Sequence, residues 1–481
     1  QTRQGEICRF RTCYPVTLWP VKVAYAGYES TDQFDFLDTA SNIATVLRLK
    51  LECTGESFAG TGLKRLRFFL GGEGAVPYVL YEQLFCHTLD VAILPENGGK
   101  PVYLPKDSIA PVGFAPGEDV LPYSPFAHPG YRLLQEYFTF DDKFLFFDLD
   151  HLDRHGSKKT FDVLVLLSQR PREQMAVDRD NFKLGCAPIV NLFRKTTEPI
   201  RWDHRQTEYR LVADVRRERT TEIHSILKVS STSDARSDTQ TYQPFYSFTH
   251  QMEGAHHKAF WHARRAATGR TEIPGSDLFL TFLDLSFKPT DPMSETIYAH
   301  ALCTNRDLAE QIPDGGLLQI EEAAPVHRIV CLNKPTRQIL PPLGGEAQWR
   351  LISHLSLNFL SLSSDKESLK AFREILTLYS FSNRLSTVQQ IMGLREMSCR
   401  KVVRRVGSDA WRGFCRGIET TLTFDESLYA GNSAFLMAAV LNRFLPLYAS
   451  INTFTQLIIK SQQREGIWKK WPPLVGEQIV L

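Results

Sequence analysis

Residues 47–52 read Leu-Arg-Leu-Lys-Leu-Glu, an alternation of apolar and charged side chains with a period of two. This is the period of a β-strand that buries one face and exposes the other to water. A second run, Leu66-Arg67-Phe68-Phe69-Leu70, has strand composition and is followed by Gly71-Gly72, which predicts a turn. The first third of the chain therefore predicts a sheet.

Strand patterns continue along most of the chain. Further strands are predicted at residues 144–147, 161–167, 208–212, 222–229, 278–287, 400–405, 418–424 and 451–460. The runs at 144–147 and 161–167 are almost wholly apolar, which is typical of strands buried on both faces. Ser230 to Thr241 contains mostly Ser, Thr and Asp, and we predict a solvated loop there.

Eight prolines fall between Pro95 and Pro129. Proline lacks an amide N–H and fixes its own φ, so this stretch is predicted to be extended. It is rich in Tyr, Phe and Leu, and we expect it to pack across a surface of the protein.

Two helices are predicted in the last third. Leu369, Phe372, Leu376 and Tyr379 recur at the spacing of one helical face. Residues 433–445 are apolar nearly all round, which is typical of a helix inside a large core or a subunit contact. Together these patterns predict an α+β, strand-dominated, multidomain structural protein.

The length of 481 residues suggests about three domains. Charge density rises between residues 170 and 180, and prolines and glycines gather between 335 and 345. We therefore predict a β-rich domain with a Pro-rich extended segment at 1–180, a β-rich middle domain at 181–335, and an α+β C-terminal domain at 336–481.

Composition excludes several classes of protein. Lys and Arg number 56 and Asp and Glu 54, so a net charge of +2 gives no overall footprint for nucleic acid. Nine scattered cysteines predict reduced thiols in a cytoplasmic protein. The most apolar run, residues 434–454, contains Asn442, Arg443 and Pro446, so no direct membrane span is predicted. The chain does not begin with Met, and we expect it to be a piece of a longer protein.

No catalytic motif is present: there is no GxxxxGK[ST], GxSxG, HExxH or EF-hand loop. His250, His256, His257 and His262 cluster, but only Glu253 accompanies them at ligand spacing, and two arginines follow. A second run holds acidic and histidine residues that a hydrolase uses for metal or acid–base work: Asp148, Asp150, His151, Asp153 and His155. A strand that runs out into a charged loop explains this run more simply. We predict no catalytic residue, no cofactor and no metal site.

Several stretches, in order along nearly the whole chain, together resemble one family. They are Cys8-Arg9-Phe10-Arg11-Thr12, residues 129–138, residues 186–193, Glu198-Pro199-Ile200, Thr207-Glu208-Tyr209, Pro244-Phe245-Tyr246-Ser247, residues 302–308, residues 414–419, residues 448–457 and residues 468–473. The chain resembles the TssF family (VasA or ImpG), which are baseplate subunits of the bacterial type VI secretion system. It departs from the family pattern in lacking a further N-terminal stretch before the Cys8–Thr12 motif.

This resemblance implies a structural role without catalysis. Proteins of this family form a wedge in which two copies join one TssG, attached to TssK and TssE. Wedges surround the VgrG spike in the cytoplasm, at the inner-membrane-docked secretion baseplate, and form the platform for tube and sheath polymerisation. The assembly resembles the baseplate of contractile-tailed phages. Two alternatives remain: a contractile-phage tail baseplate wedge protein, and a β-rich hydrolase that uses the Asp148–His155 region.

Five residues are predicted to contact partners. Asn191, Leu192 and Phe193 lie in a proline-flanked connector, where an apolar pair is exposed unless something covers it. Trp468 and Trp471 lie near a terminus, where aromatic anchors often dock on a partner. The alternative for both groups is packing within the chain.

Overall fold

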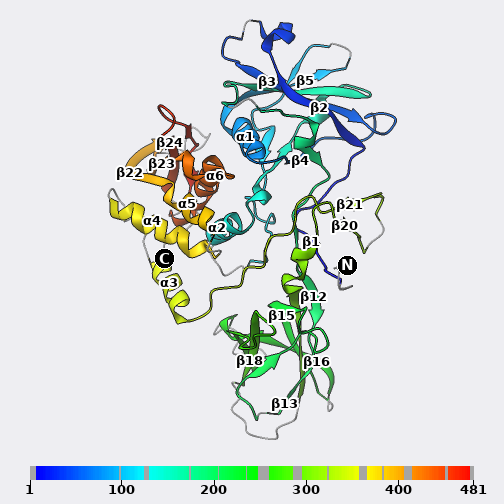
Figure 1. Cartoon of the computed structure of the whole chain (residues 1–481), viewed down its shortest axis with the longest axis vertical. Coiled ribbons are helices and arrows are strands. Elements are labelled where there is room, and N and C mark those ends of the chain that lie inside the picture. Colours follow the sequence, from blue (N-terminus) through cyan, green and yellow to red (C-terminus); the bar gives the residue numbers. More distant parts are fainter. Residues whose placement is uncertain are drawn as a thin grey trace. The chain divides into compact units, whose positions relative to one another are not determined.

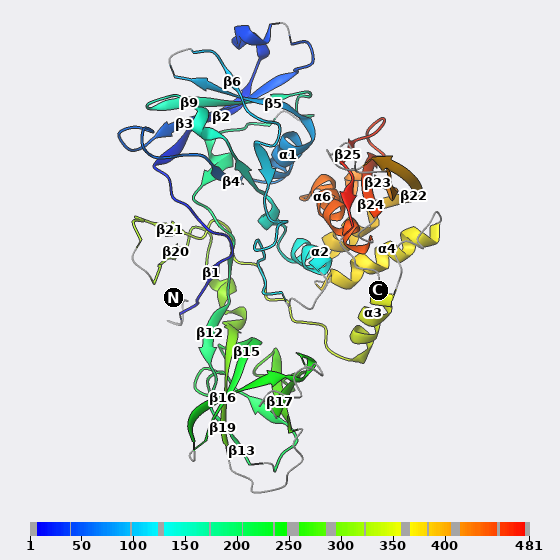
Figure 2. The ribbon, with the colours of Figure 1, turned by 180° about the vertical axis from the view of Figure 1, so that it is seen from behind.

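The computed structural model describes residues 7–38, 40–96, 99–123, 129–172, 175–203, 205–233, 236–247, 259–284, 295–321, 324–356, 366–381, 384–405, 414–449 and 453–476. The chain forms two compact units. Unit 1 consists of Gln1–Arg11 and Ile189–Trp349, and unit 2 consists of Thr12–Pro188 and Arg350–Leu481. Figure 1 shows the elements of both units, and Figure 2 shows them from behind.

The described residues of unit 2 form three sheets. The first has the order β2 (Val21–Glu29), β3 (Thr45–Cys53), β9 (Thr160–Leu167), β5 (Thr88–Pro95) and β6 (Val102–Tyr103). The second has the order β10 (Phe182–Leu184), β4 (Leu66–Leu70), β8 (Phe146–Leu149) and β7 (Ile109–Pro111). The third has the order β22 (Leu394–Arg405), β23 (Phe414–Phe424), β24 (Thr453–Ser461) and β25 (Lys469–Lys470), and β26 (Leu474–Val475) also pairs with β24.

The helices of unit 2 are α1 (Val76–Glu82), which continues as a π-helical turn over Gln83–His87, then α2 (Pro129–Thr139), α4 (Lys366–Tyr379), α5 (Leu385–Met392) and α6 (Ala434–Phe444). Most of them pack against these sheets, whereas α2 packs on α4 and α6. Helix α3 (Gly345–Ser356) and the short strand β1 (Arg11–Thr12) span the boundary between the units in the sequence. Strand β11 (Ile189–Val190) pairs with β1 and lies at the start of the second segment of unit 1. Short 3₁₀ turns occupy Thr31–Gln33, Asp35–Leu37, Asp141–Phe144, Leu152–Arg154, Arg179–Asn181, Phe245–Ser247, Arg306–Gln311, Glu426–Leu428 and Leu445–Tyr448.

Unit 1 is built on one eight-stranded sheet. Its order is β12 (Phe193–Thr196), β19 (Glu295–Thr304), β15 (Glu222–Ser233), β16 (Arg236–Pro244), β17 (Ala259–Ala267), β18 (Ser276–Asp284) and β14 (Tyr209–Leu211), and β13 (Ile200–Trp202) also pairs with β19. A small hairpin joins β20 (Leu317–Leu318) and β21 (Ile329–Val330). The strand-dominated α+β prediction is confirmed.

The alternation at residues 47–52 forms β3, as predicted. Leu47, Leu49 and Leu51 are buried, while Arg48 and Lys50 between them are partly exposed. The apolar run from Phe161 is β9, and it is buried on both faces because β3 and β5 flank it and other elements cover both sides. Its one charge, Asp162, accepts hydrogen bonds from Arg48 at 3.1 and 2.7 Å.

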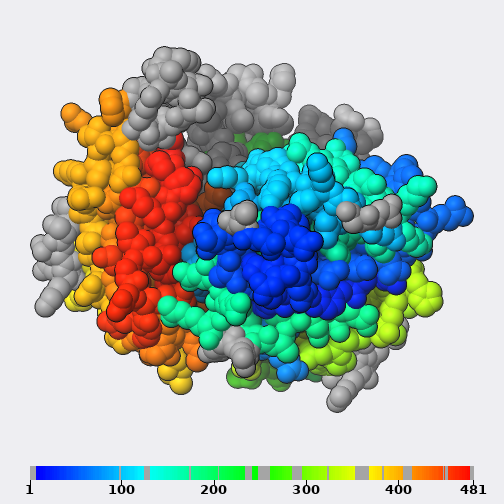
Figure 3. Space-filling model, turned by 90° about the horizontal axis from the view of Figure 1, so that it is seen from above, coloured from blue at the N-terminus to red at the C-terminus, as the bar shows by residue number. Residues whose placement is uncertain are grey.

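One hydrophobic core runs through both parts of unit 2. It contains residues as far apart in sequence as Leu47, Phe147 and Ile459, and helix α6 lies in it with nearly every residue buried. Figure 3 shows the C-terminal residues beside the first third of the chain. We predicted separate domains at 1–180 and 336–481, and the structure places most of both in one compact unit because they share this core. The predicted boundaries themselves stay a prediction.

The prediction of a loop at Ser230–Thr241 is wrong. Strands β15 and β16 pair there, with Ser230 opposite Thr241 and Ser231 opposite Gln240, while residues 234–235 lie outside the described part. Ser230 and Ser231 are buried, because β15 also pairs with β19 on its other side. The Ser231 hydroxyl donates to the Tyr242 hydroxyl at 3.3 Å, whereas the buried Ser230 hydroxyl has no hydrogen-bond partner among the described residues.

The described part of the Pro-rich segment consists of the short strands β6 and β7 joined by turns, and its residues 118–121 pack against α2. Glu136 on α2 accepts hydrogen bonds from the backbone amides of Val120 and Leu121 at 2.8 and 3.2 Å. Lys143 pairs with Glu136 and donates to the carbonyl of Glu118 at 2.9 Å. Both charged side chains are almost fully buried, and burial lowers the pKa of Lys143. The pair therefore fastens the segment to the helix from inside the protein.

None of the helices in the described residues is long and apolar enough to cross a lipid bilayer.

Removing only one partner of the Glu136–Lys143 pair should be costly. Lys143→Met leaves the Glu136 carboxylate buried without its cation, and we expect a loss of about 3–5 kcal/mol in the free energy of unfolding. The double variant Glu136→Gln/Lys143→Met removes both charges and should lose less. Thermal unfolding of the full chain measures both, with Lys22→Met as the control because its pair with Glu52 is exposed. Equal melting temperatures for Lys143→Met and Lys22→Met would contradict the assignment.

Candidate functional site

Asn191 lies in a hydrogen-bonded cluster inside unit 1. Its amide nitrogen donates to the Arg9 carbonyl at 2.7 Å and to the Asn305 side chain at 2.8 Å, and its amide oxygen accepts from the Asn305 backbone N–H at 2.7 Å. Asn305 also accepts from the Arg9 N–H at 3.1 Å and donates to the Ile7 carbonyl at 3.4 Å. The two asparagines therefore hold the N-terminal segment against β12 and β19.

The neighbouring predicted residues also pack within unit 1. Leu192 is 2% exposed, and Phe193 is partly buried against the core of the sheet, opposite Cys303 in the ladder. The apolar pair is thus covered by the chain itself. A role of Asn191, Leu192 and Phe193 in partner contact stays a prediction.

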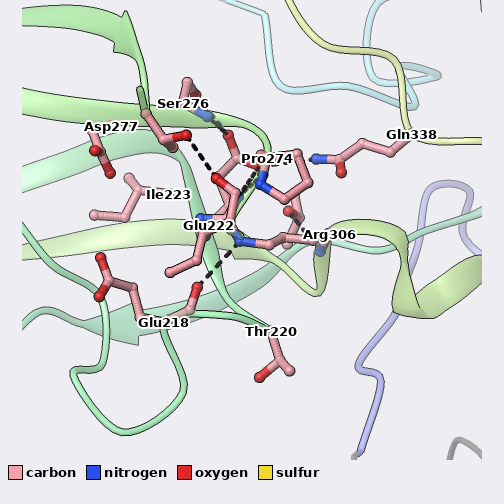
Figure 4. Close-up of polar contacts among 12 residues, drawn as sticks. Glu218, Thr220, Glu222, Ile223, Pro274, Ser276, Asp277, Arg306 and Gln338 are labelled. Atoms are coloured by element: carbon pink, nitrogen blue, oxygen red, sulfur yellow. Dashed lines mark hydrogen bonds and ion pairs between the residues drawn. The ribbon is translucent and has the colours of Figure 1, made fainter. Parts of the chain in front are cut away.

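A buried ion pair follows Asn305 directly. Arg306 donates to Glu222 at 3.2 Å, and both side chains are only 5% exposed (Figure 4). Glu222 also accepts from the Ser276 backbone N–H at 2.8 Å and from its hydroxyl at 2.6 Å. Gln338, from the segment that leads out of unit 1, donates to the same carboxylate at 3.1 Å. Every hydrogen bond to Glu222 shown here is charge-assisted, which favours a fixed geometry.

Gly275 is required beside this pair. Its φ of +129° is a conformation that only glycine adopts readily, and Arg306 itself has a φ of 55°. A Cβ at Gly275 would overlap the Arg306 Nη1 and lie 2.8 Å from Glu222 Oε2. The space is already taken by the guanidinium group.

A small cavity of about 20 Å³ adjoins the ion pair, lined by Arg210, Glu218, Glu222, Asp277 and Arg306 among others. This volume holds roughly one water molecule. Its acidic and basic groups pair with each other, since Arg210 contacts both Glu218 and Asp277. The cavity is too small for a substrate, and the charged residues that line it form a structural cluster.

Trp468 is fixed within unit 2. Its indole N–H donates to Glu82 at 2.8 Å, and the Arg464 guanidinium lies 3.7 Å from the centre of its ring. Arg464 pairs with Glu82 on α1 and with Glu426 at 2.5 Å, so it joins the first and last parts of unit 2. Burial alone would raise the pKa of Glu82, but contacts from His87, Arg464 and Trp468 outweigh it and lower the pKa to about 2.

Trp471 stacks on Phe435 of α6 with ring centres 5.7 Å apart, and its carbonyl accepts from Gln456 at 2.8 Å. Trp468 and Trp471 are both partly buried against the shared core. Packing within the chain thus accounts for both, and their role in partner contact stays a prediction.

Asp148 and Asp150 of the acidic run at 148–155 form separate ion pairs with arginines. Asp148 accepts two hydrogen bonds from Arg67 at 2.7 and 2.8 Å, and Asp150 pairs with Arg65 at 2.5 Å. His155 stacks on Phe161, and burial lowers its pKa. No three metal-ligating side chains gather in the part of the chain that the structure describes. Of the histidine cluster, His262 lies on β17, and His250, His256 and His257 lie outside the described residues.

The structure reveals exposed apolar residues that the sequence patterns did not single out. On α5, Leu385, Val388 and Met392 are 81%, 48% and 49% exposed and lie at the spacing of one helical face. The opposite face of this helix is buried through Thr387 and Ile391. The signal in the sequence is a second apolar stripe on a short helix, but the sequence alone does not say which stripe faces the core.

Comparison with known proteins gives one consistent answer. The family model described as "Type VI secretion system, TssF" matches residues 1–478. The chain belongs to the TssF family. It is similar to the type VI secretion system component TssF1 of Pseudomonas aeruginosa (strain PAO1), with 33% identity over 494 residues that cover 98% of this chain and 79% of the relative.

A solved structure is similar as well. It is described as the TssK-TssF-TssG baseplate subcomplex of the type VI secretion system, determined by cryo-electron microscopy. The matching chain has a TM-score of 0.78 and 25% identity, and the match covers 99% of this chain and 86% of that chain. The resemblance inferred from the sequence motifs is therefore confirmed.

In this TssF-family chain, several of those motif residues are structural. Asn305 and Arg306 anchor the N-terminal segment and the Glu222 carboxylate. Gly417 on β23 leaves room for Phe454 on β24, whose ring atoms lie 2.5 Å from the position that a Cβ would take. Glu419, two residues on, binds three cations at once. These four motif residues are thus explained by packing and charge neutralisation.

Substitution of Gly275 tests the Glu222–Arg306 cluster. Gly275→Ala should cost about 3 kcal/mol or more of stability, because the new methyl group displaces the guanidinium from a buried carboxylate. Gly269→Ala is the matched control: it also has a positive φ, of 64°, but nothing lies within 4 Å of its Cβ. The control should cost only about 1–2 kcal/mol. Equal losses in thermal unfolding would show that the ion pair has no special role.

The Glu82 contacts predict a pH dependence. Since the folded-state pKa of about 2 lies below the ordinary value, the carboxylate stabilises the fold above about pH 4.5 and ceases to do so as the pH falls toward 2. Glu82→Gln should therefore lower the melting temperature at pH 7, and the gap to wild type should shrink as the pH falls from about 4.5 to about 2.5. The exposed neighbour Glu465, changed to Gln, is the control and should show no such trend. A gap that is constant with pH would contradict the prediction.

Proposed function

We propose that this chain is a structural subunit of a type VI secretion baseplate wedge and assembles with TssG and TssK. The observation that carries the proposal is the family match over residues 1–478. The similarity of nearly the whole chain to one from a TssK-TssF-TssG subcomplex supports it further.

The finer assembly follows from the family resemblance. We propose that the chain pairs with a second TssF copy, contacts TssE and surrounds the VgrG spike. In this proposal it works in the cytoplasm, at the baseplate docked on the inner membrane. There it forms part of the platform on which the tube and sheath polymerise.

We propose that the role is non-catalytic. The family and the solved relative are baseplate components, and this supports the proposal. The acidic run that suggested a hydrolase is engaged in ion pairs, with Asp148 bound to Arg67 and Asp150 to Arg65. The family match also favours a secretion baseplate over a phage tail baseplate.

The exposed face of α5 suits such an assembly. Obligate interfaces bury large apolar areas, and Leu385, Val388 and Met392 offer an apolar stripe beside a well-packed helix face. Among the described residues, this stripe is a stronger candidate for a partner contact than Leu192, which is already buried.

Co-expression with TssG and TssK from the same genome tests the proposal. We expect the three proteins to co-purify as one monodisperse complex in size-exclusion chromatography with light scattering, and the chain alone to associate or precipitate. A soluble, monomeric chain that does not bind TssG would overturn the proposal.

The α5 face is tested in the same assay. Val388→Glu places a charge on the apolar stripe and should reduce complex yield at least tenfold. Gln389→Glu adds the same charge at the next exposed position of the helix and should have little effect. If both variants assemble like wild type, the partner contact lies elsewhere on the chain.

A further inference from the structure

Strand β22 forms one edge of the C-terminal sheet. Figures 1 and 2 show it on the outside of that sheet, and it pairs only with β23 among the described strands. Apart from that ladder, residues 396–405 form no backbone hydrogen bond to other described residues. An edge of this length presents a row of free N–H and C=O groups that can pair with another strand.

Basic side chains from β22, β23 and β25 gather toward the far end of this edge. We call it the basic corner and define it by Arg400, Lys401, Arg404, Arg416 and Lys470. The one carboxylate among them is Glu419, which accepts from Arg400 at 2.6 Å, Arg404 at 2.5 Å and Lys470 at 3.3 Å. Three of the five cations thus share a single anion, and the β22–β23 register places Lys401 and Arg416 on the opposite face of the strand pair from Glu419.

Two of these cations do not contact Glu419. Lys401 and Arg416 are exposed, and neither pairs with a carboxylate in the described part of the chain. The β22–β23 register places Lys401 opposite Ile418 and Arg416 opposite Val403, so both lie on the same face of the strand pair. Val403 and Phe414, also on this face, are 61% and 79% exposed. The surface therefore alternates positive charge with apolar side chains.

The charge decides which partner fits. Two copies of this edge would repel each other, because lysine and arginine on an edge strand oppose pairing with a like strand. An extended segment with acidic side chains would instead gain ion pairs while its backbone completes the ladder. Lipid headgroups and nucleic acid bind positive charge too, but neither has a peptide backbone that could pair with the free N–H and C=O groups of a strand edge.

We propose that the outer edge of β22 binds an acidic, extended segment of a partner protein as an added strand. The inference rests on the proposed role as an assembly subunit and adds a specific surface and partner chemistry to it. Ion pairs from Lys401 and Arg416 select the segment, and the backbone of β22 aligns it.

Photo-crosslinking within the co-expressed complex with TssG and TssK tests this. A benzoylphenylalanine replaces Val403, and in a control sample it replaces Lys460, an exposed residue of β24 in the same sheet. We expect an adduct from position 403 to map to a segment rich in Asp and Glu, and its yield to fall at least fivefold as the salt concentration rises from about 50 to about 500 mM, because salt screens exposed charges. An adduct on a neutral or basic segment, or none in the assembled complex, overturns the inference.

Charge reversal provides the second arm. Lys401→Glu/Arg416→Glu should reduce the adduct at least fivefold without changing the melting temperature, because both side chains are exposed. Lys64→Glu/Arg154→Glu makes the same charge change at exposed positions in the first part of unit 2 and should leave the adduct unchanged. Flotation with vesicles of phosphatidylethanolamine and phosphatidylglycerol is run in parallel. Vesicle binding that depends on Lys401 and Arg416 would assign the corner to a lipid surface and overturn the inference.

The two proposals fail in different ways. If wild type forms no complex with TssG and TssK, the assembly role falls, and this inference falls with it. If the complex forms and the Lys401→Glu/Arg416→Glu adduct matches wild type, only the acidic-strand inference is overturned.

Discussion

The ion pairs of Arg464 hold the first and last parts of unit 2 together. Arg464 contacts Glu82 near the start of the chain and Glu426 near its end, and it lies over Trp468. A guanidinium group taken out of water needs anions with defined positions, and removal of one partner leaves an uncompensated charge. The shared core alone would tolerate shifts of one sheet against another, because hydrophobic contact is non-directional. The directional contacts of Arg464 fix which surfaces meet.

Unit 1 uses the same device around a different carboxylate. Glu222 is reached by Arg306 from the end of β19, by Ser276 from the start of β18 and by Gln338 from the outgoing segment. Elements far apart in sequence converge on one buried negative charge, which each of them helps to neutralise. If one partner were missing, a buried polar or charged group would be left unpaired, which costs free energy. The cluster therefore favours the single arrangement of the chain in which all partners are present. A subunit that presents fixed surfaces to several neighbours benefits from that uniqueness more than from added stability.

The sequence predicted what is local. The alternation at Leu47–Leu51 and the helical spacing of Phe372 and Leu376 depend only on near neighbours, and both elements are present. It did not predict that Ser230 and Ser231 lie in a strand, because their burial comes from β19, which is distant in the sequence. Nor did it show that Asn191 is bound by Asn305, or Trp468 by Glu82, since these partners are set by the tertiary fold. Family motifs marked several of the right residues, but their roles became visible only from the contacts.

Charged side chains are placed differently in the interior of this protein and on its surface. Buried carboxylates such as Glu136, Glu222 and Glu419 each have a cation within hydrogen-bond range, as the cost of desolvation requires. Cations at an exposed edge face no such requirement, since water solvates them. Near one end of β22, Glu419 accounts for Arg400, Arg404 and Lys470, whereas no carboxylate of the described residues accounts for Lys401 and Arg416. Exposed cations without an intramolecular partner are best explained by a binding partner. For a subunit of an assembly, that partner is another protein.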